Sequence, residues 1–279
     1  MVKNVEFKKV PNSFQNQLKS DINNIRNETK VYMKADKTTN YYKVDVEKAE
    51  ELVEKEVHKE YKKAKLVADI KSEAASLATE LGVEDRIFAT VENQAYNTIK
   101  DHKDDFRNNP KCRQINPCKP ELGKVSKYRL DEILDDARKK SGLTQFKNNQ
   151  EFLDWFISLR NKQDLTFFQW DICKYYSSIT EDLLKKAILH AERYTNISDK
   201  DKELIMHTSK SLLFHKGQAW VKKGTSSIDI TMGGFAGAEK SDIVGLYLLD
   251  KLAELPDLDA GLYRDDGAGV TSLPPKEAE

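Results

Sequence analysis

The sequence predicts an α+β fold in which an antiparallel sheet is backed by helices. A run of strong helix formers without Pro or Gly extends over residues 46–81. An aromatic, β-rich run over residues 165–172 leads to an acid, Asp171. Near the C-terminus, apolar residues flank Asp265-Asp266-Gly267, and Asp-Gly is typical of a hairpin turn between antiparallel strands. Helical and strand-like segments are therefore mixed along the chain.

The first half of the chain is predicted to contain mainly helices. Residues 1–30 are polar, with weak helical spacing at Phe14, Leu18, Ile22 and Ile25. The pattern then predicts, in chain order, a strand-like stretch at 34–38, helices over 46–58 and 66–81 with a stop at Gly82, strands over 97–103 and 113–117, and a helix over 126–140.

The second half is predicted to alternate between helices and strands. A helix over 149–160 has an apolar stripe of Phe152, Trp155, Phe156 and Leu159. The remaining expected elements are a strand over 165–172, helices over 180–193 and 198–214 with Ser198 as N-cap, strands over 219–221 and 228–231, a helix over 238–252, and the hairpin around Asp265. Residues 271–279 read as an acidic tail.

Composition bounds the class of protein. With 279 residues and 39% hydrophobic residues, the chain can bury a core of one large or two small domains. Its 46 basic and 46 acidic residues balance, which argues against a simple electrostatic nucleic-acid binder. Residues 97–127, however, hold eight Lys and Arg against four acids, a local excess suited to phosphates. No long apolar run or signal peptide is apparent, so an intracellular protein of the nucleus or cytoplasm is expected, with reduced cysteines and no membrane association.

Three carboxylates are candidates for a metal site. Asp265 and Asp266 are adjacent in an apolar stretch, and their mutual repulsion would be relieved by a cation. Acids from separate strands can hold two divalent ions about 3.5 to 4 Å apart for phosphoryl transfer, and Asp171 would supply the third. Taken alone, the Asp-Asp-Gly segment fits a plain hairpin turn equally well.

The order and spacing of these acids resemble the palm of reverse transcriptases. One palm strand of that family has an Asp followed, after four residues, by an aromatic, as Asp171 and Tyr176 are here, and a second has an aromatic, any residue and Asp-Asp, as in Tyr263-Arg264-Asp265-Asp266. Residues 231–239 and the helical run 243–249 are similar to the family's glycine turn and template-side helix, without the usual Ser-Pro.

Upstream residues resemble the fingers of the Penelope-like branch of this family. Residues 98–103 and 110–115 are similar to its Pro-Lys-x-His-Lys and Pro-x-Arg-Pro-Ile motifs, with other residues at Ile99 and Gln114 in place of proline. Residues 34–38 resemble its Ala-Asp-Lys-Gly element. The resemblance covers about Tyr32 to Val270 and implies a mobile-element origin.

The resemblance implies a right-hand polymerase fold with fingers and palm. The expected division is an N-terminal polar extension (1–30), fingers (31–148), palm (149–270) and a C-terminal tail (271–279). The chain leaves no room for a thumb after the hairpin, so a thumb is expected to be absent or supplied by a partner.

The resemblance also implies roles for the acids. Asp171 and Asp265 would be the main metal ligands, Asp266 a weaker one, and the backbone carbonyl of Ile172 an extra oxygen. Oxygen ligands point to two Mg²⁺ ions, with Mn²⁺ as substitute. The expected chemistry is attack by a primer 3′-hydroxyl on the α-phosphate of a deoxynucleoside triphosphate, on an RNA or DNA template.

Five further residues are implied in nucleotide binding. Tyr176 would stack under the sugar and exclude a 2′-hydroxyl, or simply pack in the core. Lys100 and Arg113 would hold the triphosphate, or lie on an ordinary surface. Gly233 would let the backbone approach the nucleotide, or serve as a turn glycine. Ile172 would contribute its backbone.

The sequence therefore predicts RNA-directed DNA synthesis by two-metal nucleotidyl transfer. One alternative is a non-catalytic, thumb-less remnant or fragment that only binds nucleic acid. Another is a metal-dependent nuclease built on the acidic cluster, which the positions of Tyr176 and Gly233 do not support.

Overall fold

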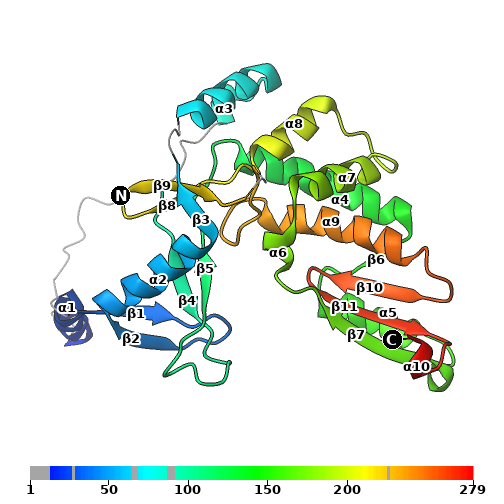
Figure 1. Ribbon diagram of the computed structural model, residues 1–279, viewed down its shortest axis with the longest axis horizontal. Coiled ribbons are helices and arrows are strands. Elements are labelled where there is room, and N and C mark those ends of the chain that lie inside the picture. The colour runs from blue at the N-terminus through cyan, green and yellow to red at the C-terminus, as the bar shows by residue number, and fades with distance from the viewer. Residues whose placement is uncertain (1–12, 27–28, 65–67, 87–91, 225–226, 279) are drawn as a thin grey trace, which may run out of the picture. The chain divides into compact units, whose positions relative to one another are not determined.

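The chain forms two compact units in a computed structural model that describes residues 13–26, 29–64, 68–86, 92–224 and 227–278 (Figure 1). The first unit comprises Met1–Lys55 and Asn97–Arg113, and the second Glu56–Tyr96 and Gln114–Glu279. The chain passes from one unit to the other between residues 55 and 56, within a helix, and between residues 96 and 97 and residues 113 and 114, each within a strand. The expected division into fingers and palm stays a prediction.

The first unit is a small α/β body around one apolar cluster. Its core consists of Met33, Leu52 and Ile99, with Tyr42 and Phe106 packed against them. The elements are α1 (Ser13–Arg26), the antiparallel pair β1 (Lys30–Lys34) and β2 (Tyr41–Asp45), the first part of α2 (Val46–Glu60), and most of the pair β4 (Tyr96–Ile99) and β5 (Cys112–Ile115). The amphipathic helix expected at Phe14 to Ile25 is thus present as α1, and residues 1–12 lie outside the described part.

The second unit has a helical core and two sheets. Its helices are α3 (Ala68–Leu81), α4 (Gly123–Ser141), α5 (Asn149–Ser158), α6 (Tyr175–Ser178), α7 (Glu181–Ala191), α8 (Asp199–His207), α9 (Gly237–Leu252) and α10 (Pro275–Ala278), with short 3₁₀ turns η1 (Glu84–Arg86) and η2 (Lys162–Asp164). Buried side chains of α4, α6, α7, α8 and α9 form the main core, among them Leu130, Leu134, Leu184, Ile188 and Leu246.

The larger sheet of this unit has the order β6-β10-β11-β7. Its strands are β6 (Thr144–Gln145), β7 (Thr166–Asp171), β10 (Asp259–Tyr263) and β11 (Asp266–Thr271), and β11 is antiparallel to both neighbours. A second sheet, β3-β9-β8, consists of β3 (Tyr61–Lys63), β8 (Leu213–His215) and β9 (Gln218–Lys222).

Helices pack on both faces of the larger sheet. On one face, α9 approaches so closely that a Cβ on Gly245 would lie 2.9 Å from Gln145 Nε2 and 3.1 Å from Leu262 Cδ2. On the other face, α5 places Trp155 Nε1 3.2 Å from Asp259 Oδ1, to which it donates, and Phe156 against Phe167. These α5 contacts lie at the end of the strands away from the β10–β11 turn.

The predicted mixture of helices and sheet is confirmed, with several boundaries corrected. The helix expected over 198–214 ends at His207, because residues 213–215 form β8 and pair with β9 through a turn in which Lys216 and Gly217 both have positive φ. The strand expected over 97–103 ends at Ile99, where a series of turns begins.

Three smaller expectations also change. Of the strand expected over 228–231, Ile228 alone forms a bridge, to Lys210. The tail over 271–279 begins with the last residue of β11 and contains the short α10. Residues 66–67 of the expected helix over 66–81 lie outside the described part. No described helix is long and apolar enough to cross a membrane.

Candidate active site at the β10–β11 hairpin

The strand register brings two predicted acids together. Asp171, the last residue of β7, is the direct cross-strand partner of Asp266, the first residue of β11. Side chains of directly paired residues lie on the same face of a sheet, with Cβ atoms about 4.5–5.5 Å apart. Both residues are exposed, as expected for the edge of a solvent-facing site.

Glycine in β11 permits this pairing. Phe168 and Trp170 lie on the face of β7 opposite to Asp171, where their rings stack with centroids 5.6 Å apart. Their cross-strand partners are Gly269 and Gly267, and a Cβ on Gly267 would overlap the Trp170 indole. The indole therefore occupies the space of a missing side chain, which holds β7 and β11 in this register.

The third predicted acid lies in the turn of the hairpin. Tyr263 pairs with Asp266, so Arg264 and Asp265 form a two-residue loop, and Arg264 has the positive φ (56°) that such loops require. The backbone carbonyl of Asp265 accepts a hydrogen bond from Ile172 N at 2.8 Å. This bond ties the turn to the end of β7.

The donor chemistry of these acids fits a hard cation. Within the described part of the chain, the carboxylates of Asp171 and Asp265 make no hydrogen bond or ion pair, so their oxygens are available. The carbonyl of Ile172 accepts Tyr175 N at 3.2 Å and keeps a second lone pair. No group of three or more His, Cys, Asp or Glu residues among those described is arranged to hold a metal ion. A divalent ion held by Asp171 and Asp265 would complete its coordination shell with water or phosphate oxygens.

Tyr176 lies on the one-turn helix α6, directly after the acid-bearing end of β7. Its side chain is half-buried and packs against the main core cluster, with its ring 6.1 Å from that of Tyr175. Tyr175 is buried and donates from its hydroxyl to the Ser241 carbonyl of α9 at 2.6 Å. Burial, followed by the charges of Asp242, Tyr176 and Asp265, raises the pKa of Tyr175, so its hydroxyl stays a donor.

Behind the hairpin, α9 takes part in a partly buried charge network. Arg138 of α4 donates from Nη2 to Asp242 Oδ2 at 3.0 Å and from Nε to Gln145 Oε1 at 2.8 Å, while Gln145 Nε2 donates to the Asp242 carbonyl at 2.6 Å. Burial raises the pKa of Asp242, and Arg138 and Arg264 oppose that rise. The network joins α4, β6 and α9 beneath the turn.

Gly233 is required by the backbone. Its φ is 108°, a conformation that L side chains rarely adopt, and a Cβ would lie 2.6 Å from the carbonyl oxygen of Asn116. Asn116 N in turn donates to the Met232 carbonyl at 3.0 Å. The turn-glycine interpretation thus accounts for this residue, and a role in nucleotide binding stays a prediction.

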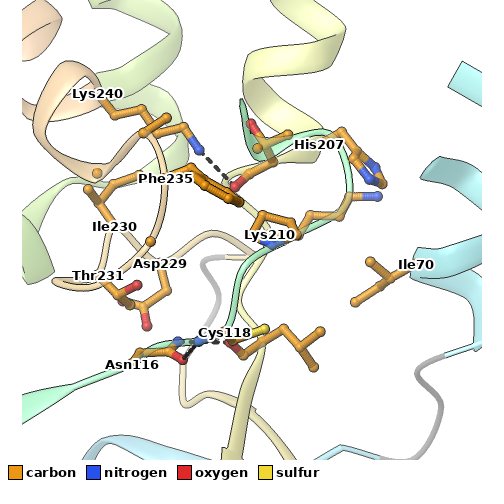
Figure 2. Close-up of a pocket in the computed structure, with 17 residues that line it drawn as sticks. Ile70, Asn116, Cys118, His207, Lys210, Asp229, Ile230, Thr231, Phe235 and Lys240 are labelled. Atoms are coloured by element: carbon orange, nitrogen blue, oxygen red, sulfur yellow. Dashed lines mark hydrogen bonds between the residues drawn. The ribbon is translucent and has the colours of Figure 1, made fainter. Parts of the chain in front are cut away.

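A pocket opens beside this glycine turn (Figure 2). It has a volume of about 50 Å³ and is lined by residues before α4, at the end of α8 and at the start of α9. Lys240 is buried at its edge and donates from Nζ to the Thr208 carbonyl at 2.7 Å. Burial lowers the pKa of Lys240 to about 7.

The two predicted phosphate ligands lie in the first unit. Lys100 follows β4, and its backbone N donates to the Lys111 carbonyl at 2.9 Å. Arg113 lies in β5, with its guanidinium Nη1 3.3 Å from Asp36 Oδ1. The Asp36 side chain is 4% exposed, and its Oδ1 also accepts from the Thr98 hydroxyl at 3.3 Å. Arg113 is therefore oriented by a buried carboxylate.

Comparisons with known proteins identify the fold. No protein-family model matches the sequence, and a search of the curated proteins finds no match. Among solved structures, apo telomerase from Candida tropicalis matches with a TM-score of 0.62 and 13% identity over 99% of this chain and 53% of that chain. The fold is similar to that of telomerase, a reverse transcriptase.

Two further telomerase structures agree. Candida tropicalis apo telomerase truncated from its C-terminal domain has a TM-score of 0.59 and 13% identity, over 87% of this chain and 52% of that one. Candida albicans telomerase in complex with the TWJ fragment of telomeric RNA has a TM-score of 0.57 and 11% identity, over 92% of this chain and 47% of that chain. The chain spans about half the length of the telomerase structures it matches. The reverse-transcriptase-like fold expected from the sequence is confirmed.

Several residues that organise the site were not predicted. Tyr175 is adjacent to the predicted Tyr176. A helix of one turn is too short for hydrophobic spacing to indicate which of the two rings is buried. Asp36 lies in the Ala-Asp-Lys element, but its pairing with Arg113 has no local pattern. Asp242 and Arg138 are 104 positions apart in the sequence and meet through helix packing alone.

Proposed function

We propose that the chain is a nucleic-acid polymerase domain that performs RNA-directed DNA synthesis by two-metal nucleotidyl transfer. The single observation that carries the proposal is the direct pairing of Asp171 with Asp266, next to a turn that contains Asp265. Carboxylates on adjacent strands of a reverse-transcriptase-like fold are suited to binding Mg²⁺ or Mn²⁺.

The acids would have different roles. Asp171 and Asp265 would be the principal ligands of two Mg²⁺ ions, with Asp266 and the Ile172 carbonyl as additional oxygens. Bound Mg²⁺ would supply charge stabilisation to the reacting phosphate and activate the primer hydroxyl. The exposure of Asp171 and Asp266 supports access by a substrate.

The remaining predicted residues would bind the nucleotide. Tyr176 would contact the sugar with the exposed part of its ring, because its other side packs on the core. Arg113 would present its remaining N–H donors to phosphate, with one end held by Asp36. Lys100 would add a positive point charge near the phosphates, and Gly233 would let the backbone approach the nucleotide closely.

The substrates and origin are also part of the proposal. The template and primer would be RNA or DNA, and the incoming nucleotides would be deoxynucleoside triphosphates. The motifs at residues 34–38, 98–103 and 110–115 support an origin in a mobile element of the Penelope-like type. An intracellular location stays a prediction.

The test is incorporation of deoxynucleotides on a primed RNA template with Mg²⁺ or Mn²⁺, comparing the chain with Asp265→Asn. Asp164→Asn is a matched control, because Asp164 is an exposed carboxylate in the turn before β7. Synthesis that Asp265→Asn abolishes and Asp164→Asn preserves would support the polymerase. Absence of synthesis in the unaltered chain would contradict it, and Mn²⁺ binding that is lost in Asp265→Asn would then favour the non-catalytic alternative.

A further inference from the structure

The short helix α6 is held in place from two neighbouring elements. The helix has one turn, follows a left-handed residue at Lys174 (φ 53°), and carries Tyr176 at its centre. On one side, Tyr175 donates from its hydroxyl to the Ser241 carbonyl of α9. On the other, Lys222 of β9 donates from Nζ to the Ser177 carbonyl at 2.8 Å. One-turn helices have little stability of their own, so such anchors decide where α6 lies.

Lys222 is held by a buried acid. Its ammonium lies 3.2 Å from Asp229 Oδ1, and the side chains of Lys222 and Asp229 are 15% and 3% exposed. The other carboxylate oxygen, Oδ2, accepts from the Tyr61 hydroxyl at 2.5 Å. Both oxygens of this buried carboxylate are therefore satisfied, as burial of a charge requires.

The strand pairing explains why these three side chains converge. Tyr61 and Lys222 are direct cross-strand partners in β3 and β9, so both side chains extend from the same face of the sheet toward Asp229. Asp229 is itself fixed through its backbone N, which donates to the Ser209 carbonyl at 2.9 Å. Burial and the charge of Asp229 raise the pKa of Tyr61, so its hydroxyl remains a donor. With one N–H directed at Asp229, the Lys222 ammonium also donates to the Ser177 carbonyl of α6.

We propose that Lys222 is a positioning residue for Tyr176: held by Asp229 and Tyr61, it fixes the Ser177 carbonyl, and with it the ring that would exclude a 2′-hydroxyl. The proposal rests on the sugar-contacting role given to Tyr176 under the proposed function. A small displacement of a group that discriminates by steric contact changes selectivity strongly, because contact with the extra hydroxyl is lost over a fraction of an ångström.

An ordinary ion pair in the core predicts a different result. If Lys222 and Asp229 merely stabilised the β3-β9-β8 sheet, their removal would lower stability and leave sugar selectivity unchanged. If Lys222 positions Tyr176, selectivity between deoxynucleotides and ribonucleotides falls in a protein that is still folded. Selectivity is a ratio within one protein, so a loss of active molecules does not alter it.

The test compares Lys222→Met/Asp229→Asn with Lys223→Met. The double variant removes the ammonium without leaving a buried, unpaired carboxylate, and methionine keeps most of the aliphatic stem. Lys223 is a matched control, because it is the next residue and its Nζ also donates to a backbone carbonyl, that of His58, at 2.6 Å. Lys222→Arg tests rescue by a conservative cation, and Tyr61→Phe provides a milder change should the double variant not fold.

Two measurements are made on each protein. The first is the ratio of kcat/KM for a deoxynucleotide to that for the matching ribonucleotide on a primed template. We expect a fall of about 10-fold or more in the double variant, a smaller fall in Tyr61→Phe, partial recovery in Lys222→Arg and no change in Lys223→Met. The second is amide hydrogen exchange across α6, which should become faster in the double variant and not in Lys223→Met.

The two measurements separate failure of this inference from failure of the proposed function. An active chain whose sugar selectivity is unchanged in the folded double variant would overturn the positioning role. A chain that incorporates no nucleotide at all would contradict the proposed function, and hydrogen exchange alone would then decide whether Lys222 anchors α6: unchanged exchange overturns the anchor, and faster exchange supports it.

Discussion

Asp171 on β7 and Asp266 on β11 are exposed and face each other directly across an antiparallel pair of strands, on the same face of the sheet. Like charges in this position destabilise a sheet. The repulsion between these two carboxylates therefore lowers the stability of the pairing, and a stability cost of this kind is typical of functional sites. This relationship makes a prediction about stability as well as activity.

Asp171→Asn should stabilise the protein without metal and remove its response to metal. We expect the free energy of unfolding to rise by about 0.2–1 kcal/mol, because the repulsion with Asp266 is relieved. Addition of Mg²⁺ should stabilise the unaltered chain, by roughly 2.7 kcal/mol at 100 times the dissociation constant, and the variant much less. Denaturant unfolding with and without Mg²⁺ measures both effects. Equal stabilisation by Mg²⁺ in the two proteins would show that Asp171 is not a ligand.

Gly267→Ala should destabilise the sheet. The added Cβ would overlap the Trp170 indole, so β7 and β11 must separate or the indole must move, at a cost of about 1–3 kcal/mol. Gly234→Ala is the control, because the nearest atom to its Cβ would be at 3.8 Å. Urea unfolding compares the two variants, and equal stabilities would exclude the indole as the reason for glycine at 267.

Tyr176→Ala should increase the use of ribonucleotides if the tyrosine excludes a 2′-hydroxyl. Primer extension with each nucleotide class should show a change of about 10-fold or more in selectivity, since a steric contact is removed. Tyr176→Phe retains the ring and should keep the selectivity of the unaltered chain. Loss of stability with unchanged selectivity in Tyr176→Ala would assign the residue to core packing, because its partly buried side chain already packs against the main core.

Lys240→Met should change how stability depends on pH. Burial lowers the pKa of Lys240 from 10.5 to about 7 in the folded protein. Between these values the unfolded chain holds a proton that the folded chain lacks, so the free energy of unfolding rises with pH, by at most about 1.4 kcal/mol per pH unit. Below pH 7 Lys240 is protonated in both the folded and the unfolded chain, and the destabilisation by its buried charge has its full value.

The variant should lose this rise between pH 7 and 10.5 and be more stable than the unaltered chain at pH 7. Denaturant unfolding at several pH values measures the difference. Lys186→Met, which replaces a half-exposed lysine of α7, should leave the slope unchanged. Parallel pH profiles for Lys240→Met and the unaltered chain would contradict a neutral buried amine.

Much of the fold could be predicted from local pattern. The Pro- and Gly-free run gave α2 and α3 nearly at their expected bounds, and Ser198 caps α8 with a complete capping box. The strand expected over 219–221 is confirmed as β9, but β8 was missed, because the apolar residues before the Lys216-Gly217 turn equally fit a helix. Tertiary pairing of β9 with β8 and β3 decides between the two.

The candidate site was predictable as a set of residues and not as an arrangement. The site residues fall into two local groups, Asp171 with Tyr176 and Tyr263 with Asp265 and Asp266, and each group has its own recognisable pattern within a few positions. The roles assigned to Asp171, Asp265 and Tyr176 stay predictions until the experiments above are done. The carboxylate that orients Arg113 and the lysine that holds α6 have no comparable local signature.

Local sequence accounts for most of the helices, for a hairpin around Asp265 and for the types of side chain at the site, because hydrophobic spacing and turn chemistry depend on neighbouring residues; the turn itself lies at Arg264-Asp265, and Asp266 and Gly267 belong to β11. Contacts between segments far apart in the chain place Asp171 opposite Asp266, orient Arg113 through Asp36 and hold Ser177 through Lys222. The physical reason is register: a slip of one residue would turn Asp171 to the other face of the sheet, and packing of Trp170 over Gly267, residues far apart in the chain, excludes that slip.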